Sequence, residues 1–193
     1  MADNIVSMRK LLLLFAISGF FLSAFSQQDT IYQKKVYTTR KVSNPPEIDG
    51  WINDEVWKEV PWGGDFQMYE PYDNRQATQE TRFKVVIDQE NIYIAIRAFD
   101  TAPDSIGKRL TRRDQIDGDM LAFQFDSYHD LQTAFTFFVS AAGSKMDAYE
   151  TLNGEGMDDT WNPIWWVKTQ VDDQGWMAEA KIPFSQVEAD PSQ

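Results

Sequence analysis

The chain has 193 residues, of which 42% are hydrophobic and 14% aromatic, and this is enough apolar surface for one packed domain of ordinary size. Its formal net charge is −12, from 18 basic and 30 acidic side chains. Such an acidic surface repels phosphate backbones and anionic lipid headgroups. We therefore expect no nucleic-acid partner, and the net charge favours neutral or cationic ligands.

The first 26 residues have the three parts of a secretory signal. Arg9 and Lys10 precede an apolar run, and Ala24-Phe25-Ser26 places small residues where a signal peptidase cleaves. We predict cleavage after Ser26, with export to the periplasm or outer membrane of a Gram-negative bacterium. A membrane-spanning anchor is the alternative, but the apolar run is shorter than the roughly 20 residues that cross a bilayer. Cysteine is absent, which is ordinary for a bacterial envelope protein.

Residues 27–44 are polar apart from the alternating stretch IYQKKVYTTRKV, which predicts a polar linker or an edge strand. From residue 45 onward, short alternating runs are bounded by turn residues, and no segment keeps a helical apolar period for long. We therefore expect a β domain over residues 45–193. Because the chain stops soon after a strand, we also expect a truncated C-terminus and a missing C-terminal domain of the same chain as a partner.

The strands of this β domain are expected in consecutive pairs. TRFKVVID and NIYIAIRAFD are separated only by Gln89 and Glu90, which predicts an antiparallel hairpin. DMLAFQFD, QTAFTFFVS and KMDAYETL follow, and the last pair is WWVKTQV and WMAEAKIPF. About seven alternating strands at this spacing predict an all-β fold, a two-sheet antiparallel β-sandwich.

The stretch PPEIDGWINDEVWKEVPW predicts a short helix near the N-terminal end of the sandwich. Asn53 or Asp54 can cap this helix, and its spacing places Val56, Trp57 and Val60 on one face. Large aromatic side chains are buried more often than they bind ligands. We therefore predict that Trp57 is a core residue that closes one end of the sandwich.

Four motifs in a fixed order resemble the family 9 carbohydrate-binding module: IDGWINDEVW, RFKVVIDQENIYIAIRAFD, GDMLAFQFDSYHD and GWMAEAKIPF. The resemblance covers residues 45–187 and is greatest to the N-terminal domains of large bacterial envelope proteins with a predicted C-terminal outer-membrane β-barrel. It implies a β-sandwich that binds polysaccharide or oligosaccharide, is often appended to glycoside hydrolases, and often holds structural calcium.

Two positions depart from the sugar-binding members that the chain resembles. Those members have a tryptophan three residues before the aspartate that opens the DMLAFQFD-type strand, and a glutamate three residues after it. Ile116 and Ala122 stand there instead. An aromatic ring stacks on the apolar face of a pyranose and a carboxylate holds its hydroxyls. The resemblance places the second stacking tryptophan beyond Gln193, so the family's sugar clamp is not predicted here.

Two other stretches supply candidate binding residues, the loop TRRDQIDGDM and the aromatic run WNPIWW. The candidate carbohydrate-binding residues are Arg112, Arg113, Asp117, Asp119, Trp161, Trp165 and Trp166. Loops at the end of a sandwich often carry function. The structural alternatives are an Arg–Asp network, which includes Asp114, and core packing by alternate tryptophans. Adjacent residues of a strand point to opposite faces, so either Trp165 or Trp166 faces outward and is the better binding candidate.

Acidic pairs suggest calcium, because carboxylate oxygens are ligands that this ion prefers. Asp117 with Asp119, or Asp158 with Asp159, are the candidates, although neither pair fits the twelve-residue calcium loop. Solvated surface charge is the alternative interpretation. A transition-metal site is disfavoured because the chain has one histidine and no thiol.

That histidine, His129, is predicted to be a turn residue that is hydrogen-bonded to Asp126 or Asp130. No nucleophile elbow, zinc-protease motif or phosphate loop is present, so we predict that the segment is not an enzyme. Paired carboxylates for glycoside hydrolysis stay open, because their separation in space decides their role. For the full-length parent protein, a glycoside hydrolase stays open.

Two functions from different classes follow from these observations. One is an exported, non-catalytic carbohydrate-binding module that serves carbohydrate catabolism, beside a partner domain that hydrolyses O-glycosyl compounds. The other is a structural periplasmic domain of an outer-membrane barrel protein, without sugar binding. The resemblance favours the first.

Overall fold

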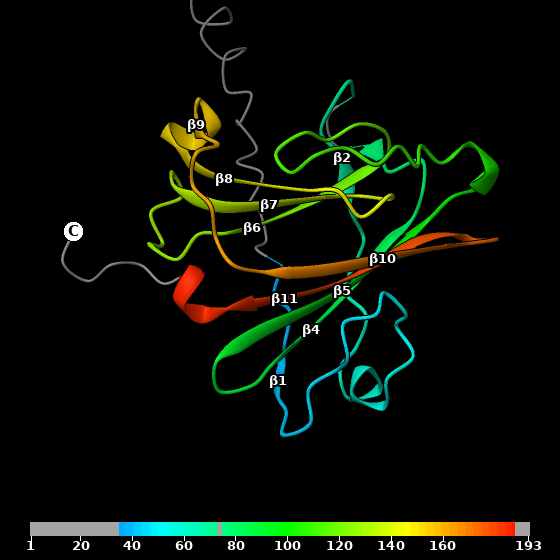
Figure 1. Ribbon diagram of the computed structural model, residues 1–193, viewed down its shortest axis with the longest axis horizontal. Coiled ribbons are helices and arrows are strands. Elements are labelled where there is room, and N and C mark those ends of the chain that lie inside the picture. Colours follow the sequence, from blue (N-terminus) through cyan, green and yellow to red (C-terminus); the bar gives the residue numbers. More distant parts are fainter. Residues whose placement is uncertain (1–34, 73–74, 188–193) are drawn as a thin grey trace, which may run out of the picture. The chain divides into compact units, whose positions relative to one another are not determined.

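Two β-sheets packed face to face form the body of the computed structural model, which describes residues 35–72 and 75–187 (Figure 1). The first sheet has five strands, in the order β1 (Arg40–Lys41), β4 (Thr81–Ile87), β5 (Asn91–Phe99), β11 (Gly175–Pro183) and β10 (Trp166–Asp172). The second has four, in the order β6 (Met120–Phe125), β7 (Ala134–Ser140), β8 (Lys145–Thr151) and β9 (Gly156–Asp158). The predicted all-β sandwich is confirmed.

The remaining elements are short. Two strands form a separate small sheet, β2 (Gln67–Met68) and β3 (Arg75–Gln76). The described part of the chain also has four short 3₁₀ segments, η1 (Glu55–Glu59), η2 (Pro103–Ser105), η3 (Leu152–Gly154) and η4 (Phe184–Gln186). The predicted short helix is therefore only the 3₁₀ turn η1. Asp54 precedes it without a capping bond, because its Oδ2 accepts the Glu47 N–H at 3.1 Å instead.

Several predicted features lie outside the described residues, namely the signal peptide (1–26) and the C-terminal residues 188–193. In the described ranges, no helix has the length and apolarity to cross a membrane. The segment predicted as a linker or edge strand contributes β1, which pairs with β4 in parallel, with Arg40 opposite Val86. No short turn joins these two strands, so they need not be antiparallel.

The predicted hairpins are present with the expected pairing. Strands β4 and β5 are antiparallel, with Phe83 opposite Ile96. Strands β6, β7 and β8 form an antiparallel meander, and β10 pairs with β11 across the turn that begins at Asp172. Gly175 closes this turn at a φ of 137°, and a Cβ there would lie 2.1 Å from the Ala98 carbonyl oxygen. Only glycine permits the turn to lie this close to β5.

The main core lies between the two sheets and is rich in aromatic rings. Strand β5 contributes every second residue, among them Ile94, and the facing sheet contributes Phe137, which is fully buried. The ring of Phe137 stacks on Phe123 at 5.5 Å and meets the edge of Trp165 at 5.1 Å. Such pairs stabilise a core beyond the apolar area that they bury. Trp165, which directly precedes β10 of the five-stranded sheet, thus packs against rings of the four-stranded sheet.

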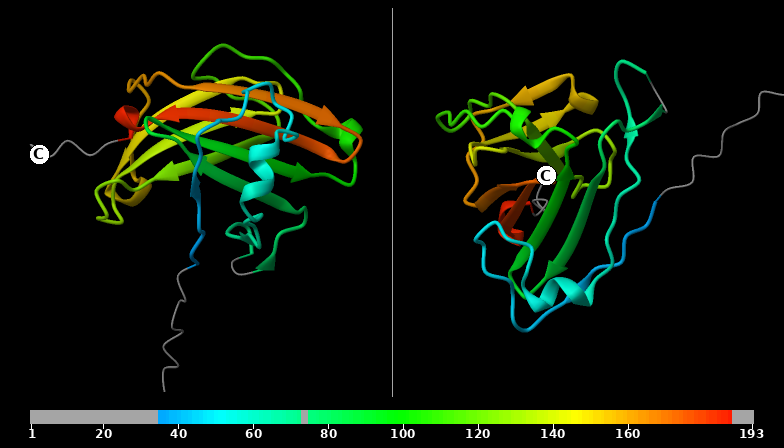
Figure 2. Two further views of the ribbon diagram at one scale, coloured as in Figure 1. Left: turned by 90° about the horizontal axis from the view of Figure 1, so that it is seen from below. Right: turned by 90° about the vertical axis from the view of Figure 1, so that its right-hand side faces the viewer.

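A second core lies on the outer face of the five-stranded sheet. It contains Trp57, which is 2% exposed, and its other buried members are Val42, Val56, Val60, Val86, Tyr93 and Ala95. Figure 2 shows η1 (cyan) beside the green strands β4 and β5, away from the yellow strands of the other sheet. The predicted burial of Trp57 is confirmed, but its predicted place at the end of the sandwich is wrong. On this outer face, β4 presents Val86 and β5 presents Tyr93 and Ala95, and the segment around η1 covers them.

Candidate functional site

The adjacent residues Trp165 and Trp166 point in opposite directions from the start of β10. Trp165 is 2% exposed and belongs to the core between the sheets, whereas Trp166 is 49% exposed. The pleat of the strand requires this divergence. Trp166 is therefore the outward ring of the aromatic run, and it lies on the outer face of the five-stranded sheet.

Trp166 belongs to a row of three side chains that crosses three strands. In the register of the sheet, Trp166 of β10 lies opposite Lys181 of β11, and Lys181 lies opposite Tyr93 of β5. The Lys181 Nζ is 5.2 Å from the centre of the Trp166 ring and 6.0 Å from that of Tyr93. The ammonium group thus sits between two aromatic rings, an arrangement that the ring quadrupoles favour.

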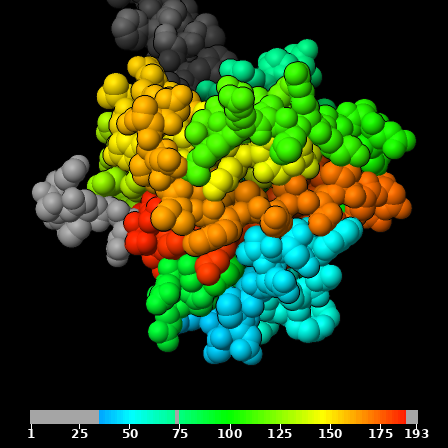
Figure 3. All heavy atoms as spheres, in the orientation of Figure 1, coloured from blue at the N-terminus to red at the C-terminus, as the bar shows by residue number. Residues whose placement is uncertain are grey.

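This row borders a hollow of about 610 Å³, which we call the Trp166 hollow. Trp165 lines it just before β10, and β10 contributes Trp166 to Lys168; β5 and β11 contribute Tyr93 and Lys181. The walls are formed by Pro45, Pro46 and Ile48 from the segment before η1, and by Gly143 and Lys145 at the β7–β8 turn. In Figure 3 the orange atoms of β10 lie between the blue-to-cyan atoms of the first wall and the yellow atoms of the second.

The lining of the Trp166 hollow is positively charged. It contains Lys145, Lys168 and Lys181 but no carboxylate. Among the described residues, neither Lys168 nor Lys181 forms an ion pair. This local charge is opposite in sign to the net charge of −12. Within a Debye length of about 8 Å at physiological salt, the local charges determine what a bound ligand experiences.

Glu179 lies opposite Lys168 in the sheet, but its carboxyl group is directed into the second core. Its Oε1 accepts the Trp57 indole N–H at 2.7 Å, and its Oε2 accepts the Gly50 N–H at 3.0 Å and the Asp49 N–H at 3.3 Å. Burial raises the pKa of Glu179 from 4.5 to about 7, although these hydrogen bonds act in the opposite direction. Glu179 therefore fixes the segment before η1 rather than neutralising Lys168.

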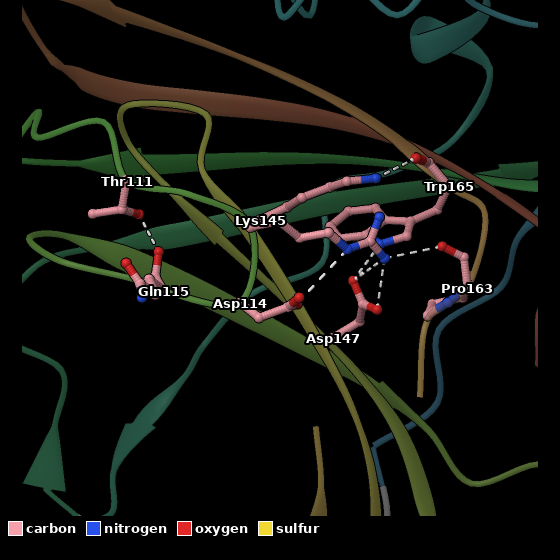
Figure 4. Close-up of polar contacts among 8 residues, drawn as sticks. Thr111, Asp114, Gln115, Lys145, Asp147, Pro163 and Trp165 are labelled. Carbon is pink, nitrogen blue, oxygen red and sulfur yellow. Dashed lines mark hydrogen bonds and ion pairs between the residues drawn. The ribbon is translucent and has the colours of Figure 1, made fainter. Parts of the chain in front are cut away.

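Arg113, predicted as a binding residue, is engaged in an internal ion pair. Its Nη2 donates to Asp147 Oδ1 at 2.8 Å, to Asp147 Oδ2 at 2.7 Å and to the Pro163 carbonyl at 3.1 Å. Trp165 Nε1 donates to the same Oδ2 at 3.1 Å, and Figure 4 shows Asp147 close to both Trp165 and Pro163. Asp147 is fully buried. The predicted Arg–Asp network is present, but the main partner is Asp147 rather than a loop aspartate. The loop aspartate Asp114 lies farther away, with its Oδ1 3.7 Å from Arg113 Nε.

Lys145 completes this cluster from the side of the Trp166 hollow. Its Nζ donates to the Trp165 carbonyl at 2.8 Å and lies 4.9 Å from the centre of the Trp165 ring. Burial lowers the pKa of Lys145, and the positive charge of Arg113 adds to this effect. Because Lys145 and Asp147 both hold Trp165, they fix the start of β10 and with it the position of Trp166.

The other predicted residues of the loop do not reach the Trp166 hollow. Arg112 is exposed, Asp117 accepts from Arg109 at 3.0 Å, and Asp119 accepts the Gly107 N–H at 2.6 Å. These contacts join the two arms of the loop to each other. The loop therefore has a structural explanation, and a binding role for its exposed charges stays a prediction.

Trp161 and His129 are likewise explained by local structure. Trp161 packs against Phe135 at 5.1 Å and against Phe137 at 5.5 Å, so it belongs to the edge of the main core. His129 is in a turn at a φ of 56°, and its side chain has no hydrogen bond within the described ranges. Its predicted bond to Asp126 or Asp130 is wrong, because both of these carboxylates accept backbone N–H groups of the same turn instead.

The acidic pairs do not gather into a metal site where the structure describes them. No group of three potential ligands occurs among these residues, and Asp158 accepts both the N–H and the hydroxyl of Thr160. Calcium binding stays a prediction that rests on the resemblance alone. A structural ion needs about six to eight oxygen ligands, which these pairs do not provide by themselves.

The two positions that depart from the sugar-binding pattern lie elsewhere. Ile116 is half-buried in the loop before β6, and Ala122 is exposed on β6 itself. Ala122 borders a second hollow of about 440 Å³, which is lined mainly by the inner faces of β4, β5 and β6. Its walls include Phe83 and Phe123, and no charged side chain lines it. Its polar lining side chains are Thr81 and Gln124, and it has neither an exposed tryptophan nor a charged group to hold a sugar, so the Trp166 hollow is the better candidate site.

The comparisons agree with this fold. The carbohydrate family 9 binding domain-like family matches residues 48–193, so the chain belongs to this family. Its domains are non-catalytic binding modules. No curated protein matches the chain.

Solved structures share the architecture at low sequence identity. A family 9 carbohydrate-binding module from Caldicellulosiruptor kristjanssonii, solved in complex with glucose, has a TM-score of 0.53 at 19% identity, over 79% of this chain and 72% of that chain. A structure from the same organism in complex with cellotriose has a TM-score of 0.54 at 18% identity, over 80% and 79% of the two chains. At such identities, the likeness supports the fold alone.

Sequence reasoning identified Trp166 as one of two possible outward rings but missed the lysines beside it. The turn at Asp172 to Gly175 fixes the register that places Lys181 opposite Trp166, so this neighbour could have been found by counting along the hairpin. Tyr93 and the wall around Pro46 come from distant segments. No local pattern in the sequence indicates that they meet at this site.

Proposed function

We propose that this protein is an exported, non-catalytic saccharide-binding module that holds glycan at the Trp166 hollow. The observation that supports this proposal is a half-exposed tryptophan beside a hollow with hydrogen-bond donors on its rim. The indole face offers a stacking surface for the apolar side of a pyranose, and the lysine ammonium groups can donate to its oxygens.

The affinity is expected to be weak. A single stacking ring without a second ring or an orienting carboxylate contributes only a few kcal/mol, which corresponds to a dissociation constant in the millimolar range. Solved relatives in the same fold class were captured with glucose and cellotriose, so gluco-oligosaccharides and xylo-oligosaccharides are reasonable first probes.

Titration of the protein with cellotriose and xylotriose, followed by amide chemical shifts, tests the site. We expect shifts at β10 and β11 that Trp166→Ala abolishes. Trp62→Ala is the matched control, because Trp62 is 41% exposed and also lies beside a lysine, with the Lys84 Nζ 4.7 Å from its ring centre. Binding that survives Trp166→Ala but not Trp62→Ala would place the site elsewhere.

The cellular role is part of the same proposal. The N-terminal pattern supports export, and family membership supports a place in carbohydrate catabolism, beside a partner domain that hydrolyses O-glycosyl compounds. Mass spectrometry of a bacterial envelope fraction should find a mature N-terminus at Gln27. An intact N-terminus in the cytoplasm would contradict the proposed export.

A structural periplasmic domain of an outer-membrane barrel protein is the second candidate function. Ile116 and Ala122 favour it, because neither can stack on a sugar or hold its hydroxyls. This function predicts no shift changes with any glycan at high concentration. The titration described above therefore separates the two candidates.

A further inference from the structure

The charge of the Trp166 hollow indicates which saccharides it binds. This inference rests on the proposed saccharide binding. We propose that the hollow selects saccharides that bear a carboxylate, that is, uronic acid residues, over neutral sugars of the same shape. The whole chain has 30 acidic and 18 basic side chains, yet the lining of this hollow has three lysines and no acid. The net charge alone, which favours neutral or cationic ligands, is misleading at this site.

Two of the lysines flank the stacking surface. Lys181 Nζ is 5.2 Å from the centre of the Trp166 ring, and Lys168 lies two residues along β10 from Trp166, on the same face of the sheet. A pyranose stacked on Trp166 would lie in the hollow that these two lysines also line. A uronate replaces the neutral hydroxymethyl substituent with a carboxylate, which accepts charge-assisted hydrogen bonds from them.

The carboxylates nearest to this face are already engaged. Glu179 accepts from the Trp57 indole and from the backbone of Gly50, and burial keeps it partly protonated near neutral pH. Asp88 accepts the hydroxyl of Tyr93 at 2.7 Å and two backbone N–H groups. Glu47, which lies between two wall residues, does not line the hollow. No protein acid therefore satisfies Lys168 or Lys181, and a ligand carboxylate can.

Matched ligand pairs test this proposal with the full chain. Trigalacturonate is titrated against its fully methyl-esterified form, and glucuronate-substituted xylotriose against its methyl ester, in 0.15 M salt. We expect each uronate to bind about tenfold more tightly than its neutral counterpart. At 1 M salt, where the Debye length is about 3 Å, this ratio should fall toward one.

Charge-removing variants assign the effect to residues. Lys181→Met and Lys168→Met keep most of the length of each side chain. Each should weaken uronate binding by a larger factor than binding of the neutral counterpart, so the uronate preference should fall several-fold. Lys41→Met is the matched control, because Lys41 is exposed in β1, at the opposite edge of the same sheet from β10. Amide spectra of each variant establish that it is folded.

The outcomes separate this proposal from the proposed function. Equal binding of uronate and ester would overturn the carboxylate preference and leave saccharide binding intact. Binding of no saccharide at all would overturn both. A glucose 6-sulfate that binds as tightly as glucuronate would show that the hollow recognises negative charge in general, and would also overturn the preference for carboxylate.

Discussion

Two buried carboxyl groups each accept a hydrogen bond from a tryptophan indole, but in different charge environments. Asp147, between the sheets, accepts from Trp165 at 3.1 Å and also from the guanidinium of Arg113. Glu179, on the outer face, accepts from Trp57 at 2.7 Å and otherwise only from backbone N–H groups. Where no cation compensates for burial, the pKa of Glu179 rises to about 7.

The difference teaches how the site is built. The Asp147 cluster fixes the start of β10 and therefore the stacking ring, and the Glu179 cluster fixes the wall that precedes η1. The first depends on a charge pair and the second on a carboxyl group that is partly protonated near neutral pH. The two sides of the Trp166 hollow should therefore respond differently to substitution and to pH.

The largest expected effect on stability comes from removing the Trp57 indole, which donates to Glu179. Trp57→Ala should lower the free energy of unfolding by about 3 to 5 kcal/mol, because it leaves a cavity in the second core and removes a donor from a buried carboxyl group. Chemical denaturation measures this. Trp51→Ala, at a 41% exposed tryptophan nearby, is the control and should cost less than about 1 kcal/mol. Equal losses in the two variants would show that Trp57 does not support the core.

Breaking the charge pair of the other cluster should have the next largest effect. Arg113→Gln leaves Asp147 buried without its cation, which should lower the free energy of unfolding by about 2 to 3 kcal/mol. Arg112→Gln is the matched control at the exposed neighbour and should change it by less than about 0.5 kcal/mol. A loss shared by both variants would indicate a general effect of loop charge instead of the pair with Asp147.

The pH dependence of stability sharpens the comparison. Because the folded pKa of Glu179 is raised from 4.5 to about 7, its contribution to stability is full below pH 4.5 and is lost as the pH rises through 7. The free energy of unfolding of the wild type, relative to Glu179→Gln, should fall by on the order of 2 kcal/mol over this window. Denaturation series at several pH values measure this difference in the free energy of unfolding between the two proteins. Parallel curves for the two proteins would mean that Glu179 does not titrate in this range.

The smallest expected effect is at the stacking ring itself. Trp166→Ala removes a half-exposed side chain and should lower the free energy of unfolding by less than about 1 kcal/mol. Trp165→Ala, at the adjacent residue, should cost about 3 to 5 kcal/mol because that ring is buried. Thermal and chemical unfolding of the two variants test this contrast. A large loss for Trp166→Ala would assign the ring to folding instead of ligand binding.

Much of the fold could be predicted from the sequence. The alternation of apolar and polar residues in TRFKVVID and NIYIAIRAFD, with the short connection at Gln89, was sufficient to predict the hairpin and the face that it buries. The burial of Trp57 followed from its spacing with Val56 and Val60. Its location did not, because the pattern says that a face is apolar but not which surface covers it.

The site was less predictable than the fold. The divergence of Trp165 and Trp166 follows from strand geometry alone, but which ring is buried depends on Asp147 and Phe137, at least eighteen residues away along the chain. The buried partner of Arg113 could not be identified either. The loop contains acids that are nearer to Arg113 in the sequence, such as Asp114. Only the folded structure brings Asp147 of β8 to Arg113.

The turn at Gly175 has a consequence for how this binding surface can vary. Strand β10 starts at the stacking ring and ends at this turn, which is held against the end of β5. Side chains alternate along a strand, so one residue inserted between Gly175 and Lys168 would exchange the faces of all residues before it. The buried and the exposed tryptophan would then trade places. Insertions that keep the surface intact must therefore come in pairs or lie beyond the strand, even though the turn itself does not line the Trp166 hollow.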